Sequence, residues 1–248
     1  MIGGGQLARM THQAAIALGQ CLRVLATTSS DPAAQVSANV VLGSHDDLDD
    51  LRRAADGAVA LTFDHEGVPL AHLQHLEAEG VAVRPPSKAL HFAQDKLAMR
   101  ERLSELGLPV PDYADLAGDR DGARTRLVEF GDAHGWQVVI KTVRGGYDGR
   151  GVWLVDNRDA ALEVFDTRPT DLPALMVESK VDMRRELSAM IARSPFGQGG
   201  AWPVVETVQQ NHVCHVVRAP APVSGAVAQT AADLARAIDE VAEAVGRG

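Results

Sequence analysis

The stretch Val138–Val155 reads VVIKTVRGGYDGRGVWLV and decides how the rest of the chain is interpreted. Apolar runs at its two ends predict two β-strands, Val138 to Lys141 and Gly151 to Val155. The connection between them is rich in glycine and carries Arg144 and Arg150. Such a turn can present successive N–H groups to an anion, and a lysine at the end of a strand adds a fixed positive charge. We therefore expect a phosphate-binding loop, because a plain hairpin tip needs only about two to five residues.

The sequence before this stretch alternates strand-like and helix-like segments. The expected strands are Cys21–Ala26, Val40–Leu42, Ala58–Phe63 and Val81–Val83, and the expected helices are Leu7–Leu18, Asp46–Ala55 and Pro69–Glu79. Repeated βα units of this size predict a parallel sheet with helices on both faces. The first part of the chain is therefore expected to be a Rossmann-like α/β domain.

From about Ser87 onward the pattern becomes mixed. The expected helices are Asp95–Leu106, Thr125–His134, Asp159–Asp166 and Gly225–Val245, and the expected strands beyond the glycine-rich stretch are Leu175–Glu178, Glu186–Arg193, Trp202–Val208 and His212–Val217. This order predicts a second domain of α+β character.

The turn Gly3–Ala8 fits the dinucleotide pattern G-x-G-x-x-G/A, with Asp31 at a distance suited to a ribose-binding carboxylate. Only Met1 and Ile2 precede the glycines, so the strand that should lead into the turn is almost absent. Two interpretations stay open: an NAD(P)-dependent oxidoreductase, and a tight turn that binds no dinucleotide.

The run Leu175–Val181 is an apolar strand that ends in Glu178 and leaves in extended form. Its backbone could bind a purine, and Glu186 begins a further strand with its side chain on the polar face. An ordinary polar strand face is the alternative. His72 and His75 lie three residues apart on an expected helix, and a solvated helix face is favoured over a metal site.

Composition sets outer limits on function. The 248 residues are 46% hydrophobic and 23% charged, as in globular proteins, and the net charge of -9 argues against nucleic-acid binding. No apolar run is long enough to span a membrane, and no charged leader precedes an apolar core. Two cysteines, Cys21 and Cys214, favour a reduced compartment, so we expect a cytoplasmic protein.

Taken in order, the motifs resemble the ATP-grasp superfamily, and within it the 5-(carboxyamino)imidazole ribonucleotide synthetases of purine biosynthesis. The matching stretches are Gly3–Met10, Thr62–Pro69, Val83–Ser87, Ala93–Leu97, Lys141 with Gly145–Gly151, and Glu178–Ser188. The resemblance implies a pre-ATP-grasp domain at residues 1–88 and an ATP-grasp domain at 89–248, with its lid at about 113–178 and an incomplete core at 179–248.

The resemblance also implies a role for individual residues around ATP. Lys96 and Lys141 would contact the phosphates, and Glu178 with Val181 would bracket the adenine. Glu186 would bind the ribose. The glycines expected to close over the phosphates are Gly145, Gly146, Gly149 and Gly151.

The aminoimidazole ribonucleotide would face three further residues, Tyr147, Asp148 and Arg150, which carry the catalytic step by this resemblance. Gln209 stands where the family often has a histidine that touches ATP. The glycine turn at Gly3 would then serve the nucleotide substrate or domain packing.

The implied reaction is ATP-dependent carboxylation of 5-aminoimidazole ribonucleotide by bicarbonate, with Mg²⁺ as a cofactor and a homodimer as the assembly. The family's magnesium-binding Glu and Asn-Glu lie beyond a point equivalent to Gly248, so we expect no protein metal ligands here and impaired turnover. Alternatives are another ATP-grasp ligase and a nucleotide-binding fragment without catalysis.

Overall fold

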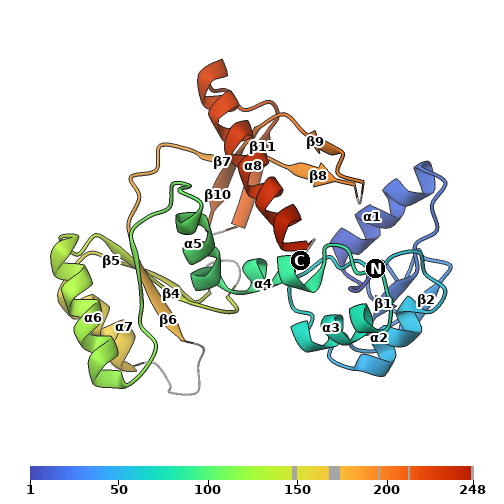
Figure 1. Ribbon diagram of the computed structural model, residues 1–248, viewed down its shortest axis with the longest axis horizontal. Coiled ribbons are helices and arrows are strands. Elements are labelled where there is room, and N and C mark those ends of the chain that lie inside the picture. The colour runs from blue at the N-terminus through green and yellow to red at the C-terminus, as the bar shows by residue number, and fades with distance from the viewer. Residues whose placement is uncertain (147–149, 168–173, 195, 212, 247–248) are drawn as a thin grey trace. The chain divides into compact units, whose positions relative to one another are not determined.

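The computed structural model describes residues 1–146, 150–167, 174–194, 196–211 and 213–246. The chain forms two compact units, Met1–Gln94 and Asp95–Gly248, whose elements are labelled in Figure 1. Among the described helices, none combines the length and apolar character needed to cross a lipid bilayer.

The first unit is built on a parallel sheet. Strand β1 (Val24–Ala26) pairs with β2 (Val40–Leu42). Single parallel bridges extend the sheet from Ile2 to Leu25 on one side and to Phe63 on the other, and from Leu61 to Val83. The resulting order is β2, β1, residues 1–2, residues 61–63 and residue 83, which confirms the predicted parallel α/β architecture.

Helices cover both faces of this sheet, as the period of two along its strands requires. They are α1 (Gln6–Ala17), α2 (Leu48–Ala55), α3 (Leu70–Ala78) and α4 (Ser87–Gln94). One core contains Met1, Ala8, Val24, Ala26 and Ala33. The opposite core contains Ile2, Leu25, Leu51, Ala54, Ala55, Leu61, Val68, Leu73, Leu76, Val83 and Leu90. Successive residues of each strand therefore enter different cores.

Three sequence-based expectations for the first unit need correction, and one of them is the strand expected at Val81–Val83, which is a single bridge at Val83. The strand expected at Cys21–Ala26 begins only at Val24, and the strand expected at Ala58–Phe63 is reduced to bridges at its last residues. Conversely, Ile2 lies at the centre of the sheet with partners on both sides, although the sequence offered almost no strand there. A segment of only two residues can occupy the centre of a sheet when the chain on each side supplies its backbone partners.

The second unit begins with α5 (Lys96–Glu105) and a four-stranded sheet of order β3-β6-β4-β5. The strands are β3 (Tyr113–Asp115), β4 (Val138–Thr142), β5 (Val152–Val155) and β6 (Leu175–Ser179), all antiparallel to their neighbours. Helices α6 (Arg120–Ala133) and α7 (Arg158–Thr167) lie beside each other in Figure 1. Their side chains pack on one face of the sheet, where Leu127, Ile140 and Val177 are fully buried.

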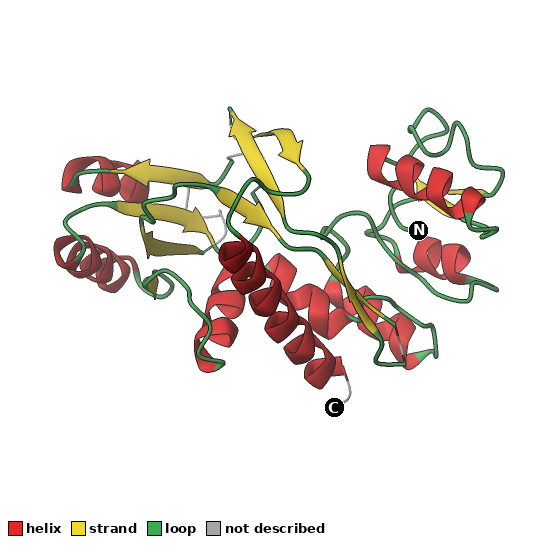
Figure 2. Ribbon diagram, turned by 90° about the horizontal axis from the view of Figure 1, so that it is seen from above, coloured by secondary structure: helices red, strands yellow, loops and turns green. Residues whose placement is uncertain are grey.

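The remainder of the unit holds a three-stranded sheet of order β11-β10-β7 and a separate hairpin, β8-β9. The strands are β7 (Glu186–Ser188), β8 (Ile191–Arg193), β9 (Gly199–Ala201), β10 (Val205–Gln210) and β11 (Val213–Arg218). Helix α8 (Gly225–Gly246) contacts β8 and is the long red helix that ends near the C label in Figure 2.

Two strand predictions in this unit were wrong in detail, and strands β3 and β9 were not predicted. The expected strand Glu186–Arg193 is two strands in different sheets, because alternation alone cannot distinguish one strand from two in succession. The expected strand Trp202–Val208 starts only at Val205, since Pro203 lacks the N–H that a ladder needs. Strand β3 holds an edge of its sheet with only three residues.

Candidate functional site

The predicted phosphate-binding lysine lies on the sheet face opposite α6 and α7. Register pairs Val139 with Glu178 and Lys141 with Met176, so the Lys141 and Glu178 side chains share one face. The Lys141 ammonium donates to Glu178 Oε2. Arg100 of α5 donates from Nε to the other carboxylate oxygen, Oε1, at 2.7 Å. The structure thus places two cations on one carboxylate whose side chain is only 3% exposed.

The glycine-rich loop follows directly from β4. Gly145, Gly146 and Gly151 have φ values of +67°, +83° and +71°, a backbone region in which a side chain is strained. Thr142 N donates to Gly151 O at 2.9 Å and closes the base of the loop. A methyl group on Gly146 would lie 2.5 Å from the Arg150 carbonyl oxygen. The two ends of the loop are therefore too close for any residue but glycine at Gly146.

The first turn of α5 is tied to the same loop. Lys96 donates from its backbone N to Val143 O at 2.9 Å and from Nζ to Gly145 O at 2.7 Å. Asp95 caps the helix by accepting from Ala98 N at 2.9 Å, and its second oxygen accepts from Arg144 Nε at 2.9 Å. The short segment 141–145 therefore begins with Lys141, one of the two lysines predicted to bind phosphate. The other, Lys96, is hydrogen-bonded to the far end of this segment.

Other predicted ATP contacts lie on elements that follow β6. Val181 is 52% exposed and accepts a hydrogen bond from Met183 N, so this stretch leaves the sheet in a turn. Glu186 begins β7 opposite Thr207 of β10. Gln209 is exposed and lies at an irregularity in the pairing of β10 with β11. The roles assigned to these three residues by resemblance stay predictions.

A second buried carboxylate lies on β10. Glu206 is 6% exposed and accepts from Arg218 Nη1 at 2.7 Å and from Arg185 Nη1 at 3.3 Å. Arg185 also donates to Pro222 O at 2.9 Å, which fixes the segment between β11 and α8. No role was predicted for these residues, and their contacts join β10, β11 and the segment that leads to α8.

Three residues of the expected site, Tyr147, Asp148 and Gly149, lie outside the described residues, while Arg150 is described and exposed. Sequence reasoning missed Arg100 and gave Asp95 no role. The available signal for Arg100 was its spacing: it follows Lys96 by four residues, which puts both on one side of a helix.

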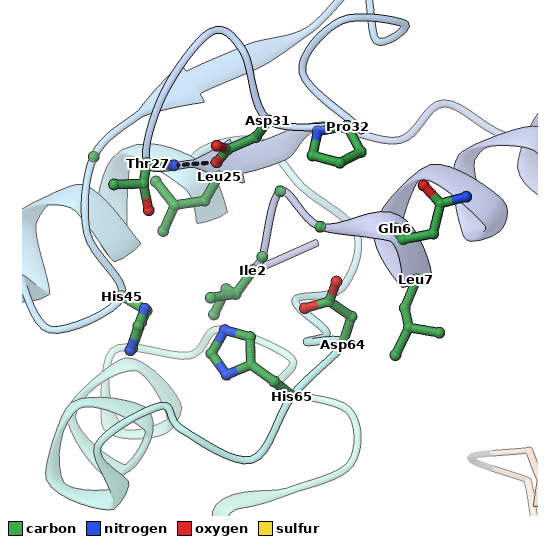
Figure 3. A pocket seen from close by; sticks show the side chains of 14 residues that line it. Ile2, Gln6, Leu7, Leu25, Thr27, Asp31, Pro32, His45, Asp64 and His65 are labelled. Carbon is green, nitrogen blue, oxygen red and sulfur yellow. Dashed lines mark hydrogen bonds between the residues drawn. The ribbon is translucent and has the colours of Figure 1, made fainter. Parts of the chain in front are cut away.

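A hollow of about 470 Å³ lies in the first unit at the carboxyl ends of the parallel strands (Figure 3). It is lined by Ile2, Gly3, Gly4, Gly5, Gln6, Leu7, Leu25, Thr27, Asp31, Pro32, Gly43, His45, Asp64 and His65. In open parallel sheets ligands bind where the direction of strand order reverses. Here that point lies between residues 1–2 and residues 61–63, directly beside the glycine turn.

Hydrogen bonds in this hollow argue against the dinucleotide interpretation. The Asp31 carboxylate, drawn bonded to Thr27 in Figure 3, accepts from the Thr28 hydroxyl and the Thr27 amide at 2.7 and 2.9 Å. The Thr28 hydroxyl is the main cause that lowers the pKa of Asp31 below its usual value. Asp31 is thus committed to its own loop, and Asp64 caps α1 by accepting from Ala8 N at 3.0 Å.

No metal centre is formed within the described ranges: no three side chains of His, Cys, Asp or Glu are grouped to hold an ion there. His72 and His75, weighed as ligands from the sequence, instead bond to the backbone oxygens of Asp46 and Ala71 at 2.9 and 2.6 Å. His45 and His65 meet edge to face with ring centroids 4.8 Å apart.

The fold and the cationic loop define a class of protein. Residues 101–247 match the ATP-grasp domain, and residues 1–94 match the ribonucleotide synthetase preATP-grasp domain. The chain belongs to the ATP-grasp family.

Within this family, the chain is similar in sequence to N5-carboxyaminoimidazole ribonucleotide synthases. It is 57% identical to that of Mycobacterium leprae over 226 residues, which are 89% of this chain and 51% of the relative. The Corynebacterium ammoniagenes synthase is 48% identical over 222 residues, 90% of this chain and 52% of the relative. The chain therefore spans about half the length of these curated relatives, and the resemblance inferred from the motifs is confirmed.

Solved structures give the same grouping. The N5-carboxyaminoimidazole ribonucleotide synthetase of Thermus thermophilus has a TM-score of 0.84 at 31% identity, covering 98% of this chain and 64% of that one. The Aspergillus clavatus enzyme, solved with ADP and 5-aminoimidazole ribonucleotide, has a TM-score of 0.84 at 29% identity, covering 98% and 62%. An ADP complex of a further synthetase has a TM-score of 0.87 at 28% identity, covering 96% and 61%.

Proposed function

We propose that the protein carries out ATP-dependent carboxylation of 5-aminoimidazole ribonucleotide with bicarbonate, giving N5-carboxyaminoimidazole ribonucleotide for purine biosynthesis. The observation that supports this most directly is the glycine turn that follows Lys141, in which Lys96 Nζ donates to Gly145 O and Gly145, Gly146 and Gly151 have positive φ values. Its sequence occurs in a chain 57% identical to a named synthase. We also propose that the protein is cytoplasmic and assembles as a homodimer.

In the proposed reaction a bicarbonate oxygen attacks the γ-phosphate of ATP, which gives carboxyphosphate and releases ADP. The exocyclic amine of the ribonucleotide then forms a bond to the carboxyl carbon, with loss of inorganic phosphate and a proton. Lys96 and Lys141 would bind the phosphates and offset the charge of the transferring phosphoryl group. Gly145, Gly146, Gly149 and Gly151 would let the backbone approach the phosphates and close over them. Exclusion of water by that closure protects a labile carboxyphosphate.

The adenosine part of ATP would lie beyond β6. Glu178 and Val181 are proposed to bracket the adenine, Glu186 to bind the ribose and Gln209 to approach ATP from β10. The lid would comprise residues 113–178 and the core residues 179–248.

The ribonucleotide substrate would be met by Tyr147, Asp148 and Arg150 of the loop. Separately, the hollow in the first unit is proposed to bind a phosphorylated nucleotide, because it opens at the switch point of a parallel sheet beside the N-terminus of α1. The Gly3 N–H already donates to Leu25 O at 3.1 Å, so the N–H groups of Gly4 and Gly5 are the proposed donors to an anionic group in this hollow.

Magnesium is expected with ATP in this family, and Mg²⁺ usually takes one or two carboxylates together with substrate phosphates. The residues that the structure describes hold no metal-binding group of three side chains. No step of the proposed reaction is assigned to a magnesium ion held by these residues.

The test is release of ADP from MgATP in the presence of bicarbonate, with and without 5-aminoimidazole ribonucleotide. We expect slow ADP release that depends on the ribonucleotide, in keeping with the impaired turnover predicted above, and we expect Lys141→Met to abolish it. Lys88→Met, which removes an exposed lysine of α4, is the matched control and should match the parent chain. Binding of ATP without any ribonucleotide-dependent ADP release would refute the carboxylase and favour a non-catalytic nucleotide-binding role.

A further inference from the structure

The Glu178 carboxylate has more positive charge around it than its own charge requires. It is 3% exposed on the central strand β6, and each of its two oxygens accepts from a different cation, Arg100 Nε and Lys141 Nζ. The Arg100 and Lys141 side chains are 23% and 21% exposed. One cation would neutralise the carboxylate, so the second is available for another partner.

Of the two cations, Lys141 is the one proposed to bind a second partner, a phosphate of the nucleotide. When its ammonium turns to a nucleotide phosphate, its hydrogen bond to Glu178 is weakened or lost. A buried carboxylate left without a cation is strongly unfavourable, because desolvation of the charge is then uncompensated. Without a substitute, Glu178 would therefore hold Lys141 back from the phosphate.

We infer that Arg100 is a positioning residue that keeps Glu178 neutralised and so releases Lys141 to the phosphates of ATP. This inference rests on the proposed function, in which Lys141 binds phosphate. Arg100 acts through Glu178 and Lys141 and is assigned no contact with the nucleotide.

The setting of Arg100 suits this role. Its guanidinium stays charged at any physiological pH and is desolvated more readily than an ammonium. Helix α5 is fixed to the backbone next to Lys141, because the Asp95 carboxylate accepts from Arg144 Nε and Lys96 N donates to Val143 O. Arg100 thus approaches Glu178 from a rigid element, and it need not move when Lys141 does.

The first experiment compares binding of ATP and of adenosine by calorimetry, using the 248-residue chain and its variants. Arg100→Met should weaken ATP binding about ten- to a hundredfold, as expected for loss of a hydrogen bond between charged groups. Adenosine has no phosphate for Lys141, so its affinity should fall by much less than that of ATP. Arg102→Met is the matched control, since Arg102 pairs with Glu105 on the same helix, and it should bind ATP like the parent.

A double-mutant cycle with Glu178→Gln separates positioning from general damage. Once the buried carboxylate is gone, Arg100→Met should cause no further loss of ATP affinity. An equal loss in both backgrounds, or an equal loss for ATP and adenosine, overturns the inference. Thermal unfolding is measured for every variant, and if Arg100→Met does not fold, Arg100→Gln takes its place with the same expected outcome.

Arg100→Lys provides the rescue, because it restores a positive charge beside Glu178. It should bind ATP more tightly than Arg100→Met, and equal binding of the two variants counts against the inference. If the parent chain binds ATP and Arg100→Met binds it equally well, the inference fails while the proposed nucleotide site stands. If the parent chain itself does not bind ATP, the proposed function fails and the inference falls with it.

Discussion

Adding a single methyl group to the glycine loop should separate backbone strain from steric blockage. In Gly146→Ala the new Cβ would lie 2.5 Å from Arg150 O and 3.3 Å from Thr142 Oγ1, at a φ of +83°. Gly145 offers a matched control, because it has a φ of +67° and no atom within 4 Å of the position a Cβ would take. Both variants therefore carry the left-handed strain, and only one carries the clash.

The expected magnitudes follow from these two contributions. An alanine in the left-handed region costs about 1–2 kcal/mol relative to its favoured conformation. The contact with a backbone carbonyl at Gly146 adds about 1–3 kcal/mol, the usual range for overpacking. Since about 1.4 kcal/mol is a factor of ten in affinity, Gly146→Ala should bind ATP about five- to a hundredfold more weakly than Gly145→Ala.

The assay is calorimetric titration of each variant with ATP, together with thermal unfolding. The loop lies outside the buried core of the sheet, so we expect ATP affinity to differ between the variants by more than their unfolding temperatures do. Equal ATP affinity for Gly145→Ala and Gly146→Ala would refute the reasoning, because it would mean that the loop base does not need to be closed for binding.

Two further predictions concern the end of α6. Gly131→Ala should lower the free energy of unfolding by about 1–3 kcal/mol, because its Cβ would meet the Trp136 ring at 2.5–2.6 Å; thermal melting checks this, and a rise, the usual result for a helical Gly→Ala change, would contradict it. His134 donates to Phe130 O and to the Asp112 carboxylate, and these bonds, in that order, raise its pKa. Protonated His134 therefore stabilises the fold below its ordinary pKa of 6.5, and that stability is lost as pH rises through the raised value. In denaturant titrations His134→Leu should be less stable than the parent chain at pH 6 and approach it at pH 9, and a pH-independent difference would exclude the mechanism.

Much of the fold was predictable where the pattern is local. Two apolar runs predict the strands that flank the glycine-rich loop. The glycines between them predict the loop, because a tight backbone turn requires glycine. Apolar periodicity predicts a helix from Gly225 to Val245, and the observed helix α8 ends one residue later, at Gly246. A long periodic segment is predicted well because its many repeats average out local ambiguity.

The rest depended on contacts that sequence spacing does not encode. Ile2 forms a central strand because Leu25 and Phe63 supply partners on both sides, and those partners are distant in sequence. Arg100 contacts Glu178 across 78 positions of the chain. An arginine on a helix and a glutamate on a strand do not by themselves predict that the two form an ion pair.

The second unit uses the same electrostatic arrangement twice, and the difference between the two cases is informative. Glu206 is held by Arg185 and Arg218, two guanidiniums whose charge cannot be withdrawn, and one of them also anchors Pro222 O. Glu178 is held by one arginine and one lysine. A lysine ammonium has three donors on a flexible stem and can exchange partners at less cost than a planar guanidinium. The carboxylate beside the glycine loop is thus the one paired with an exchangeable cation, which is the arrangement that phosphate binding next to Glu178 requires.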